Sequence, residues 1–395
     1  MTAELSTVRD AEGFAALARE WDELVLAMPR PSPFLLHGWL RTWWEHHASG
    51  RELHIHLARE GGRLTGALPL YVRRRLGVRV AAFPGDDAAA LADVLLAPGA
   101  EPSTAGRLAA RASDGADVVD VFGLPAASRL AASVPVGELT LIERAEAPVL
   151  DLAGGWEAVY TARTSAKRRN LHRRRRKQLA GLGEVTFEVA RSAPELTAAL
   201  EEAFRLHALR WSDRPEASGF ATPAGRRFHR AAIRALAPSG VPRIVLLRVG
   251  GRAVACNYSF VLGDRMYFHE LAFDPVVARW SPGQLTTLAA IEAAAADGVQ
   301  RVEFLGGGER YKLELADRLE PLHQGIGLAS SARGRAAAMA RLASVRAHRR
   351  LKQTPVRRLY YEGLAPARRL ARVTRSATSA RRGTSAPGAS PARMP

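Results

Sequence analysis

The sequence has little cysteine and lysine and lacks a long hydrophobic run. Its 395 residues include one cysteine, Cys256, so the chain can form no internal disulfide and no cysteine-ligated zinc site. A single cysteine is typical of a reducing, cytoplasmic protein. Because Cys256 lies within an expected strand, we expect it to be a buried apolar side chain and not a nucleophile.

Two further absences exclude classes of protein. No stretch reaches the roughly 18 apolar residues of a transmembrane helix, and residues 1–26 alternate acidic and apolar side chains where a secretory leader would have a basic and then an apolar segment. No cysteine pair or acidic triad suggests a metal site, so we expect no metal. The sequence thus predicts a cytoplasmic protein.

The net charge of +18 is concentrated at the C-terminus. Residues 331–395 hold sixteen Lys and Arg against one acid, Glu362, and the rest of the chain is nearly neutral. With only four lysines, the arginine excess is also what GC-rich coding would produce. Two interpretations stay open: a compositional bias, or a tail that binds nucleic acid or the inner face of an anionic membrane. The tail begins as an Ala/Arg helix, and its Ser, Pro and Gly content from Ser376 predicts disorder.

A repeat indicates a duplicated unit. The segment Arg59-Glu60-Gly61-Gly62-Arg63 is matched 189 residues later at Arg248–Arg252, and the strand end at Val119–Gly123 is matched 183 residues later at Val302–Gly306. A period this long predicts two domains of one kind, in agreement with the chain length. We expect domains at 1–150 and 151–330, followed by the tail at 331–395. The first copy has no counterpart of the turn at Ser281, so we expect it to act as a scaffold.

The second copy predicts a mixed sheet. Strands are expected at 244–249, 254–262 and 266–273, separated by glycine turns, and another at 302–305. Ser281-Pro282-Gly283 opens a helix before that last strand. A parallel crossover of this kind places free backbone N–H groups and a positive dipole end at the sheet edge, where a phosphate can bind.

Elsewhere the pattern predicts alternating helices and strands of an α/β (α+β) protein. Helices are expected at 8–28, through Trp43-Trp44, and at 103–113, 156–179, 194–209 and 226–236. Strands are expected at 54–59, 64–72, 78–83, 91–96, 118–122 and 185–190. The aromatic residues of the first two helices are expected in the core.

Several of these segments resemble the GNAT acyltransferase superfamily, in its cellulose-biosynthesis (CelD/BcsL-type) branch, which is related to the Fem aminoacyltransferases. The resemblance is carried by five segments in the second half: Ser165–Asn170, Leu206–Trp211, Phe273–Pro275, Ser281–Gly283 and Gly307–Lys312. It implies two tandem GNAT-like domains, the first of them degenerate. It also implies acetyl-CoA or another acyl-CoA as co-substrate.

The cofactor would bind at the turn that opens the helix. The usual GNAT pyrophosphate loop is Gln/Arg-x-x-Gly-x-Gly/Ala, and here Ser281 and Gly283 occupy the two small positions while Ala278 replaces the Gln or Arg. The resemblance implies donor contacts at Phe273, Ser281, Pro282, Gly283 and Gln284. An ordinary helix start, with a serine cap and a proline in the first turn, is the alternative for this motif.

Acyl transfer to an amine or hydroxyl needs a base. Glu270 is the first candidate and Glu303 the second; His269 is expected on the opposite face of the strand from Glu270. The alternative for each carboxylate is an ion pair with an arginine. The resemblance implies that Tyr311 protonates the leaving thiolate and that Lys312 holds an anionic acceptor or phosphate.

A basic run precedes these motifs. Arg163 and residues 167–177 include nine basic side chains and no acid. This charge favours binding of the donor's phosphates, of an anionic glycan or lipid head group, or of RNA over a solvated helix face. Lys167 and Arg169 are its candidate binding residues. The resemblance places His207, Arg210 and Trp211 on the acceptor side.

Three functions remain open. The first is an acyltransferase that moves an acyl group from acyl-CoA directly to an amine or hydroxyl of a small molecule or glycan, such as a surface polysaccharide or glycolipid precursor. The second is a Fem-like aminoacyltransferase that uses aminoacyl-tRNA. The third is a non-catalytic GNAT-like protein whose tail binds an anionic polymer or membrane.

Overall fold

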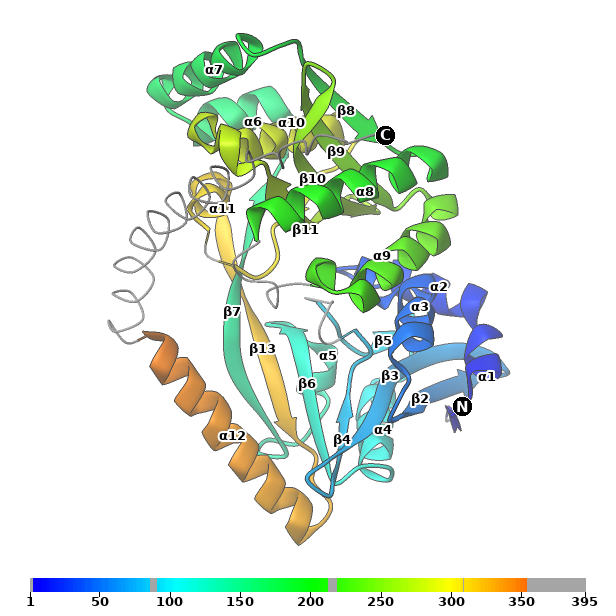
Figure 1. Ribbon diagram of the computed structural model, residues 1–395. Helices are drawn as coiled ribbons and strands as arrows, with labels where there is room; N and C mark the ends of the chain where they lie inside the picture. Colours follow the sequence, from blue (N-terminus) through cyan, green and yellow to red (C-terminus); the bar gives the residue numbers. More distant parts are fainter. Residues whose placement is uncertain (1–2, 86–90, 212–218, 308, 354–395) are drawn as a thin grey trace, which may run out of the picture. The chain divides into compact units, whose positions relative to one another are not determined.

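The computed structural model describes residues 3–85, 91–211, 219–307 and 309–353 (Figure 1). The contacts divide the chain into two units, with the boundary after Ala338. The first unit is built on a single mixed sheet of thirteen strands flanked by helices, so the predicted fold class is confirmed. The predicted disorder from Ser376 lies outside the described residues.

The elements of the first half follow the predicted order with changed bounds. They are β1 (Glu4–Val8), α1 (Ala11–Ala15), α2 (Ala18–Leu26), the 3₁₀ helix η1 (Pro33–Leu35), α3 (His37–His47), β2 (Arg51–Glu60), β3 (Arg63–Arg75), β4 (Val78–Ala82), β5 (Leu95–Leu96), α4 (Thr104–Ser113), β6 (Val118–Pro125), α5 (Arg129–Ala132) and β7 (Leu139–Asp151). The helix predicted over 8–28 is wrong at its start, because the alternating segment Glu4–Val8 pairs with β2 as an edge strand.

The second half begins with two helices and ends with a long strand. Its elements are α6 (Trp156–Arg163), α7 (Ala166–Ala180), β8 (Val185–Ala190), α8 (Ala193–Arg210), η2 (Gly219–Ala221), α9 (Pro223–Leu236), η3 (Ala237–Ser239), β9 (Pro242–Val249), β10 (Arg252–Leu262), β11 (Arg265–Phe273), η4 (Pro275–Trp280), α10 (Pro282–Ala296), β12 (Arg301–Glu303), α11 (Arg310–Leu315) and β13 (Arg318–Gly327); α12 (Ala332–Gln353) follows. The single helix predicted over 156–179 is two, because Ser165 is extended and caps α7 by accepting from the Arg168 N–H.

The predicted duplication appears in the topology. Strands β1-β2-β3-β4-β6 lie in the same order as β8-β9-β10-β11-β12, and the last pair of each set, β4 with β6 and β11 with β12, is parallel. Helices α4 and α10 make the corresponding crossovers. Each half therefore carries the same strand–helix arrangement around one parallel pair.

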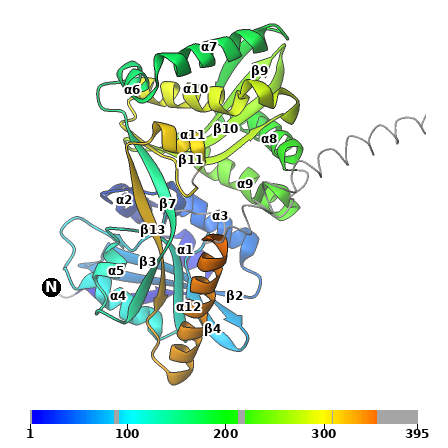
Figure 2. The ribbon, with the colours of Figure 1, turned by 90° about the vertical axis from the view of Figure 1, so that its left-hand side faces the viewer.

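The two halves exchange their last strands. β7 belongs to the first half in sequence but pairs with β12, and β13 from the second half pairs with β6; β7 and β13 also pair with each other over ten residues. Figures 1 and 2 both show these two strands side by side between the halves. Because β7 ends at Asp151 within the second half's sheet, the domain bounds 1–150 and 151–330 remain a prediction.

The halves also meet in a buried ion network. Glu303 on β12 is completely buried and accepts hydrogen bonds from Arg265 on β11, at 2.8 Å, and from Arg30, at 3.0 and 2.5 Å. Arg30 also pairs with Glu320 on β13 at 2.6 Å. Nearby, the Tyr267 hydroxyl donates to the Pro31 carbonyl. A first-half segment is thus fixed to three strands of the second half.

The core confirms the expected places of the aromatic residues. Trp21, Trp39 and Trp43 are fully buried, and so is Cys256, whose thiol pKa burial raises to about 12. Within the described ranges, no helix has both the length and the apolarity that a membrane span requires.

Candidate functional site

The site begins where two parallel strands separate. β11 and β12 pair only over Arg265–Tyr267 and Arg301–Glu303. Beyond that point β11 continues to Phe273, whereas the other strand turns away at Phe304. Among the described residues, no strand pairs with the last residues of β11 on this side, which leaves room for an extended ligand at the edge of the strand.

Helix α10 starts beside this opening. Its N-cap, Ser281, is left-handed at φ 51° and ψ 51°, and Pro282 follows as the first helical residue. At Gly283 an added Cβ would lie 3.0 Å from Cδ1 of Phe273, so glycine allows the helix to approach β11 closely. A strained cap and a glycine at a close contact are common where backbone meets a ligand.

A cleft of about 660 Å³ lies between β11, α7, α10 and α11, and is called the α7–α10 cleft below. It brings together seven of the predicted site residues: Lys167, Arg210, Phe273, Ser281, Gly283, Gln284 and Tyr311. Its other lining residues are Ser165, Arg168, Leu171, Arg175, Leu271, Ala278, Arg310 and Glu314. Predicted donor residue Pro282 is buried within the helix start behind this lining.

Positive charge dominates the cleft. Five lining side chains are cationic, and Glu314 is the one carboxylate among them. Glu314 is shared, since Arg168 binds it with two hydrogen bonds of 2.7 and 2.8 Å and Arg310 with one of 2.8 Å. Arg175 donates to Oε1 of Gln284 at 3.3 Å, and burial together with Arg168 and Arg174 lowers its pKa. The charge excess fits a ligand with several phosphates.

A bulge in β11 changes which face its residues occupy. Tyr258 pairs with Glu270 and Ser259 with Phe268, so His269 is an extra residue in the ladder. The prediction that His269 and Glu270 lie on opposite faces is therefore wrong. His269 contacts the Tyr258 ring at 5.2 Å, on the face that α8 covers, and Glu270 is paired with that same tyrosine.

Glu270 has the environment of a general base. The carboxyl is partly buried, and this burial raises its pKa to about 7, although Arg210 and Lys312 act in the opposite direction. Arg210 is held over the Phe273 ring at 4.4 Å and donates to the Leu271 carbonyl. Glu270 thus lies next to the cleft, between Arg210 and the end of β11, and can gain or lose a proton near neutral pH.

Tyr311 on α11 lines the cleft opposite this strand. Burial is the largest cause of its raised pKa, with Glu309 adding to it, so the phenol keeps its proton over the working pH range. Lys312 is buried; it donates to the Gly306 carbonyl at 3.3 Å and pairs with Glu309 at 3.0 Å. These contacts hold the glycine turn, although Gly308 itself lies outside the described residues.

Other predicted site residues lie away from the cleft. Arg169 donates to the carbonyls of Thr161 and Thr164 and so fixes the junction of α6 with α7. His207 is buried against Phe220, and burial lowers its pKa to about 4. Trp211 stacks on Arg210 at 4.8 Å. Glu303 is enclosed in the ion network, which favours the ion-pair alternative for this residue.

The sequence analysis did not name five polar residues of the cleft as site residues: Ser165, Arg168, Arg175, Arg310 and Glu314. The spacing of Arg168 and Arg175, one heptad apart, was a usable signal, because it places both on one face of α7. No local sequence signal marked Glu314, because its partner Arg168 is 146 residues away in the chain. Among the described residues, no group of side chains could hold a metal ion.

Comparisons with known proteins agree with this geometry. Residues 166–313 match the family model described as Acetyltransferase (GNAT) domain. No curated protein sequence is detectably similar to the chain. The fold is similar to that of FemX, at a TM-score of 0.56 and 9% identity over 81% of this chain and 96% of that one.

Two other solved structures share the fold. L-PGS from Bacillus licheniformis has a TM-score of 0.52 and 12% identity, covering 84% of this chain and 96% of that chain. The C-terminal domain (DUF2156) of a protein assigned as a lysylphosphatidylglycerol synthetase from Agrobacterium fabrum has a TM-score of 0.53 and 13% identity, with the same two shares.

Proposed function

We propose, from the premise that residues 166–313 form a GNAT-type acyltransferase domain, that the α7–α10 cleft binds an acyl-CoA and that the acyl group passes directly to an amine or hydroxyl. One observation carries the proposal: a strongly cationic cleft is lined by Arg210 and Tyr311, and both interact with the Glu270 carboxyl, whose pKa burial raises to about 7. The phosphates would lie at Lys167, Arg175 and the start of α10.

The chain's own residues account for both proton transfers. Glu270, ionised, removes the proton from the acceptor nitrogen or oxygen as that atom bonds to the thioester carbonyl carbon. The carbon–sulfur bond then breaks, and the departing thiolate takes the phenolic proton of Tyr311. Arg210, fixed over Phe273, positions the β11 end and keeps a positive charge beside the reacting carbonyl.

Replacing Tyr311 with phenylalanine tests this assignment. We expect kcat for thiol release from acetyl-CoA to fall about 100-fold while KM for acetyl-CoA changes little, because the ring keeps its packing and only the proton donor is lost. The assay follows free thiol with a panel of amine and hydroxyl acceptors. The matched control is Tyr160→Phe, which removes a hydroxyl bonded to His172 outside the cleft lining. Equal rates in Tyr311→Phe and wild type would contradict the assignment.

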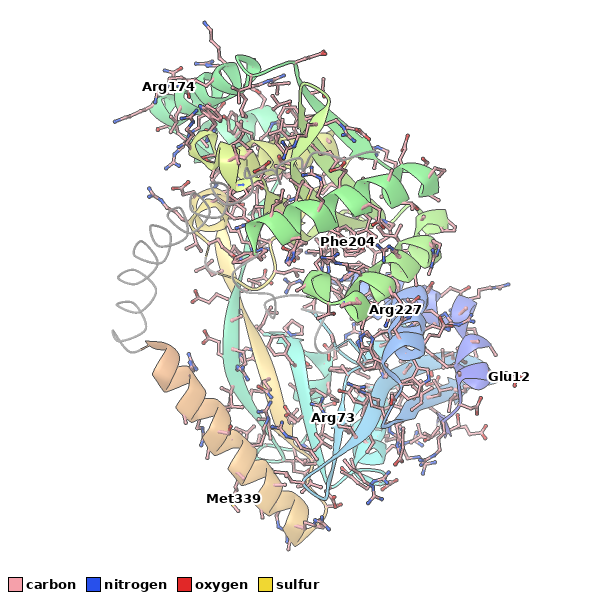
Figure 3. All side chains as sticks on the ribbon, viewed as in Figure 1. Glu12, Arg73, Arg174, Phe204, Arg227 and Met339 are labelled. Carbon is pink, nitrogen blue, oxygen red and sulfur yellow. The ribbon has the colours of Figure 1, made fainter. Side chains whose placement is uncertain are left out.

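An aminoacyl-tRNA donor is the second candidate, and the outer face of α7 favours it. Arg173, Arg174, Arg176 and Lys177 are exposed there, and Arg174 can be seen on this helix in Figure 3. No acid lies on the helix, and the fold similarity to FemX and L-PGS is compatible with such a donor. This hypothesis predicts saturable binding of aminoacyl-tRNA that weakens when the four exposed cations of α7 are replaced. It also predicts weak binding of coenzyme A.

The acceptor belongs to the same proposal. Resemblance to the CelD/BcsL branch favours a sugar of a surface polysaccharide or glycolipid precursor. A role for the basic tail at a membrane or on nucleic acid remains a separate prediction.

A further inference from the structure

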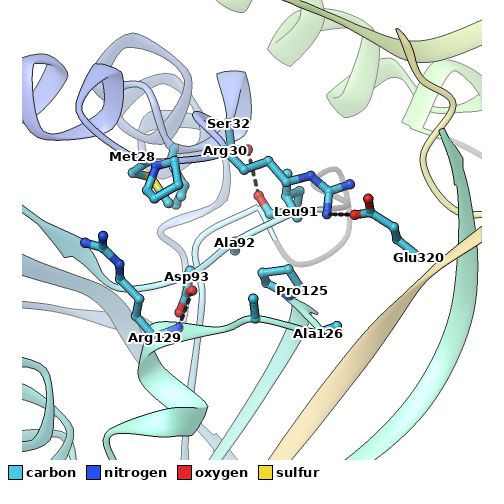
Figure 4. Close-up of a pocket in the computed structure, with 13 residues that line it drawn as sticks. Met28, Arg30, Ser32, Leu91, Ala92, Asp93, Pro125, Ala126, Arg129 and Glu320 are labelled. Carbon is cyan, nitrogen blue, oxygen red and sulfur yellow. Dashed lines mark hydrogen bonds and ion pairs between the residues drawn. The ribbon is translucent and has the colours of Figure 1, made fainter. Parts of the chain in front are cut away.

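The first half contains a cavity of its own, of about 330 Å³ (Figure 4). Most of its lining comes from three first-half segments, which lie between α2 and α3, after β4, and at and after the end of β6; Glu320 on β13 completes it. In the repeat these correspond to the segments around η2, η4 and α11 of the second half. Of these segments, η4 and α11 also line the α7–α10 cleft, so the cavity, called the first-half pocket below, is related in part to that cleft by the repeat.

The first-half pocket lacks the features that would bind phosphates in the α7–α10 cleft. Helix α4, which corresponds to α10, does not line it, and the first half has no helix that corresponds to α7. What remains is mostly apolar. Leu35, Leu91 and Ala92 form a buried floor, and Pro29 and Ala126 are exposed at the mouth. Because a liquid water occupies about 30 Å³, the pocket has room for about eleven non-hydrogen atoms.

The polar groups of the walls are almost all satisfied inside the protein. Ser32 Oγ donates to the Leu91 carbonyl at 2.7 Å. The buried carboxylate of Asp93 accepts from the hydroxyl of Ser128 and from three backbone N–H groups. Arg30 is neutralised by Glu303 and Glu320. A ligand gains nothing from these groups beyond contact with their apolar parts.

Arg129 differs from them. Its backbone N–H bonds to Asp93, but its guanidinium points away from that carboxylate and has no hydrogen bond or ion pair with the part of the chain that the structure describes (Figure 4). The side chain is half-buried at the rim of an apolar cavity. An unpaired guanidinium in such a place attracts a carboxylate or another anion, because the low polarity around it strengthens the pair.

We propose that the first-half pocket binds an amphiphilic anion, a hydrocarbon chain of about eight carbons that ends in a carboxylate, with the chain on Leu35, Leu91 and Ala92 and the carboxylate on Arg129. This site goes beyond the proposed acyl transfer and does not rest on it. The first copy then serves as a binding domain as well as a scaffold.

Titration calorimetry of the full chain with octanoate and with octan-1-ol tests the site. We expect octanoate to bind at one site per chain, about tenfold more tightly than the alcohol, because only the anion gains the charged hydrogen bonds of Arg129. Arg129→Gln removes the difference between the two probes. Ala126→Phe fills the mouth and removes the binding of both.

Two control variants make each loss specific. Arg74→Gln removes an exposed cation from β3, and Ala180→Phe adds a ring to an exposed position at the end of α7; both should bind octanoate as the wild type does. Retention of octanoate binding in Ala126→Phe would place the ligand elsewhere and overturn the proposal. So would the absence of saturable binding in the wild type, or an equal affinity of Arg129→Gln and wild type for octanoate.

Discussion

Glu270→Gln is expected to lower kcat for acyl transfer by about 10²–10⁴-fold, the usual contribution of a positioned general base. The amide keeps the size and packing of the side chain but cannot accept the acceptor's proton. In the wild type the rate should rise about tenfold per pH unit up to pH 7 and level off above it, since burial raises the pKa of this carboxyl to about 7. The variant should lose this pH dependence.

The same substitution has an expected effect on stability. The carboxyl has a pKa of about 7 in the folded protein and of 4.5 as the ordinary value, so between these values the folded chain holds a proton that the unfolded chain has released. The contribution of the Glu270 carboxyl to the free energy of unfolding is therefore fully present below pH 4.5 and is lost as the pH rises to 7. Glutamine does not ionise, so the variant does not lose this stability as the pH rises. We therefore expect Glu270→Gln to melt at a higher temperature than wild type at pH 8.

The control for both measurements is Glu309→Gln, a nearby carboxyl that pairs with Lys312 and is exposed. It should keep the rate plateau above pH 7. If Glu270→Gln retained the wild-type rate and its rise toward pH 7, another group would be the base.

Glu303→Gln is expected to destabilise the protein by about 3–5 kcal/mol, the usual cost of removing one partner from a buried ion pair. Its carboxylate is fully buried between Arg265, which is 7% exposed, and Arg30, which is 16% exposed. Without the charge, the two guanidinium groups lose their one fully buried carboxylate and keep only Glu320, beside Arg30, and the exposed Asp264, 3.6 Å from Arg265. Urea denaturation, followed by tryptophan fluorescence, measures the change.

Glu320→Gln is the matched control, since it removes a 28% exposed partner of the same arginine. A surface pair of this kind contributes about 1 kcal/mol or less, so the two variants should differ by severalfold. Equal unfolding free energies for Glu303→Gln and wild type would contradict the structural role and return Glu303 to the candidates for the base.

The repeat explains why much of the fold could be predicted from sequence. Glycine pairs at Gly61-Gly62 and Gly250-Gly251 mark the same hairpin in both halves, and the structure has both hairpins there. The strand exchange could not be predicted. β13 contains Pro321, Gly325 and Gly327, which weaken a strand pattern, and it is a strand because it pairs on both sides with β6 and β7.

The site was predictable to a similar degree. Ser281 and Gly283 could be predicted because the whole motif, a helix start with small residues, lies in neighbouring positions of the sequence. The face of His269 was not, because a one-residue bulge reverses the alternation and no local feature marks it. The raised pKa of Glu270 could not be predicted from the sequence, because it depends on how distant segments, among them α8, bury this carboxyl.

Calorimetric titration of the full chain with acetyl-CoA tests the central claim, that the α7–α10 cleft binds the donor. We expect micromolar binding, weakened about tenfold by Arg175→Gln and unchanged by Arg74→Gln, with an affinity that falls as salt is raised. Failure of wild type to bind acetyl-CoA, or equal binding by Arg175→Gln, would contradict the account. Saturable binding of aminoacyl-tRNA in its place would favour the second donor.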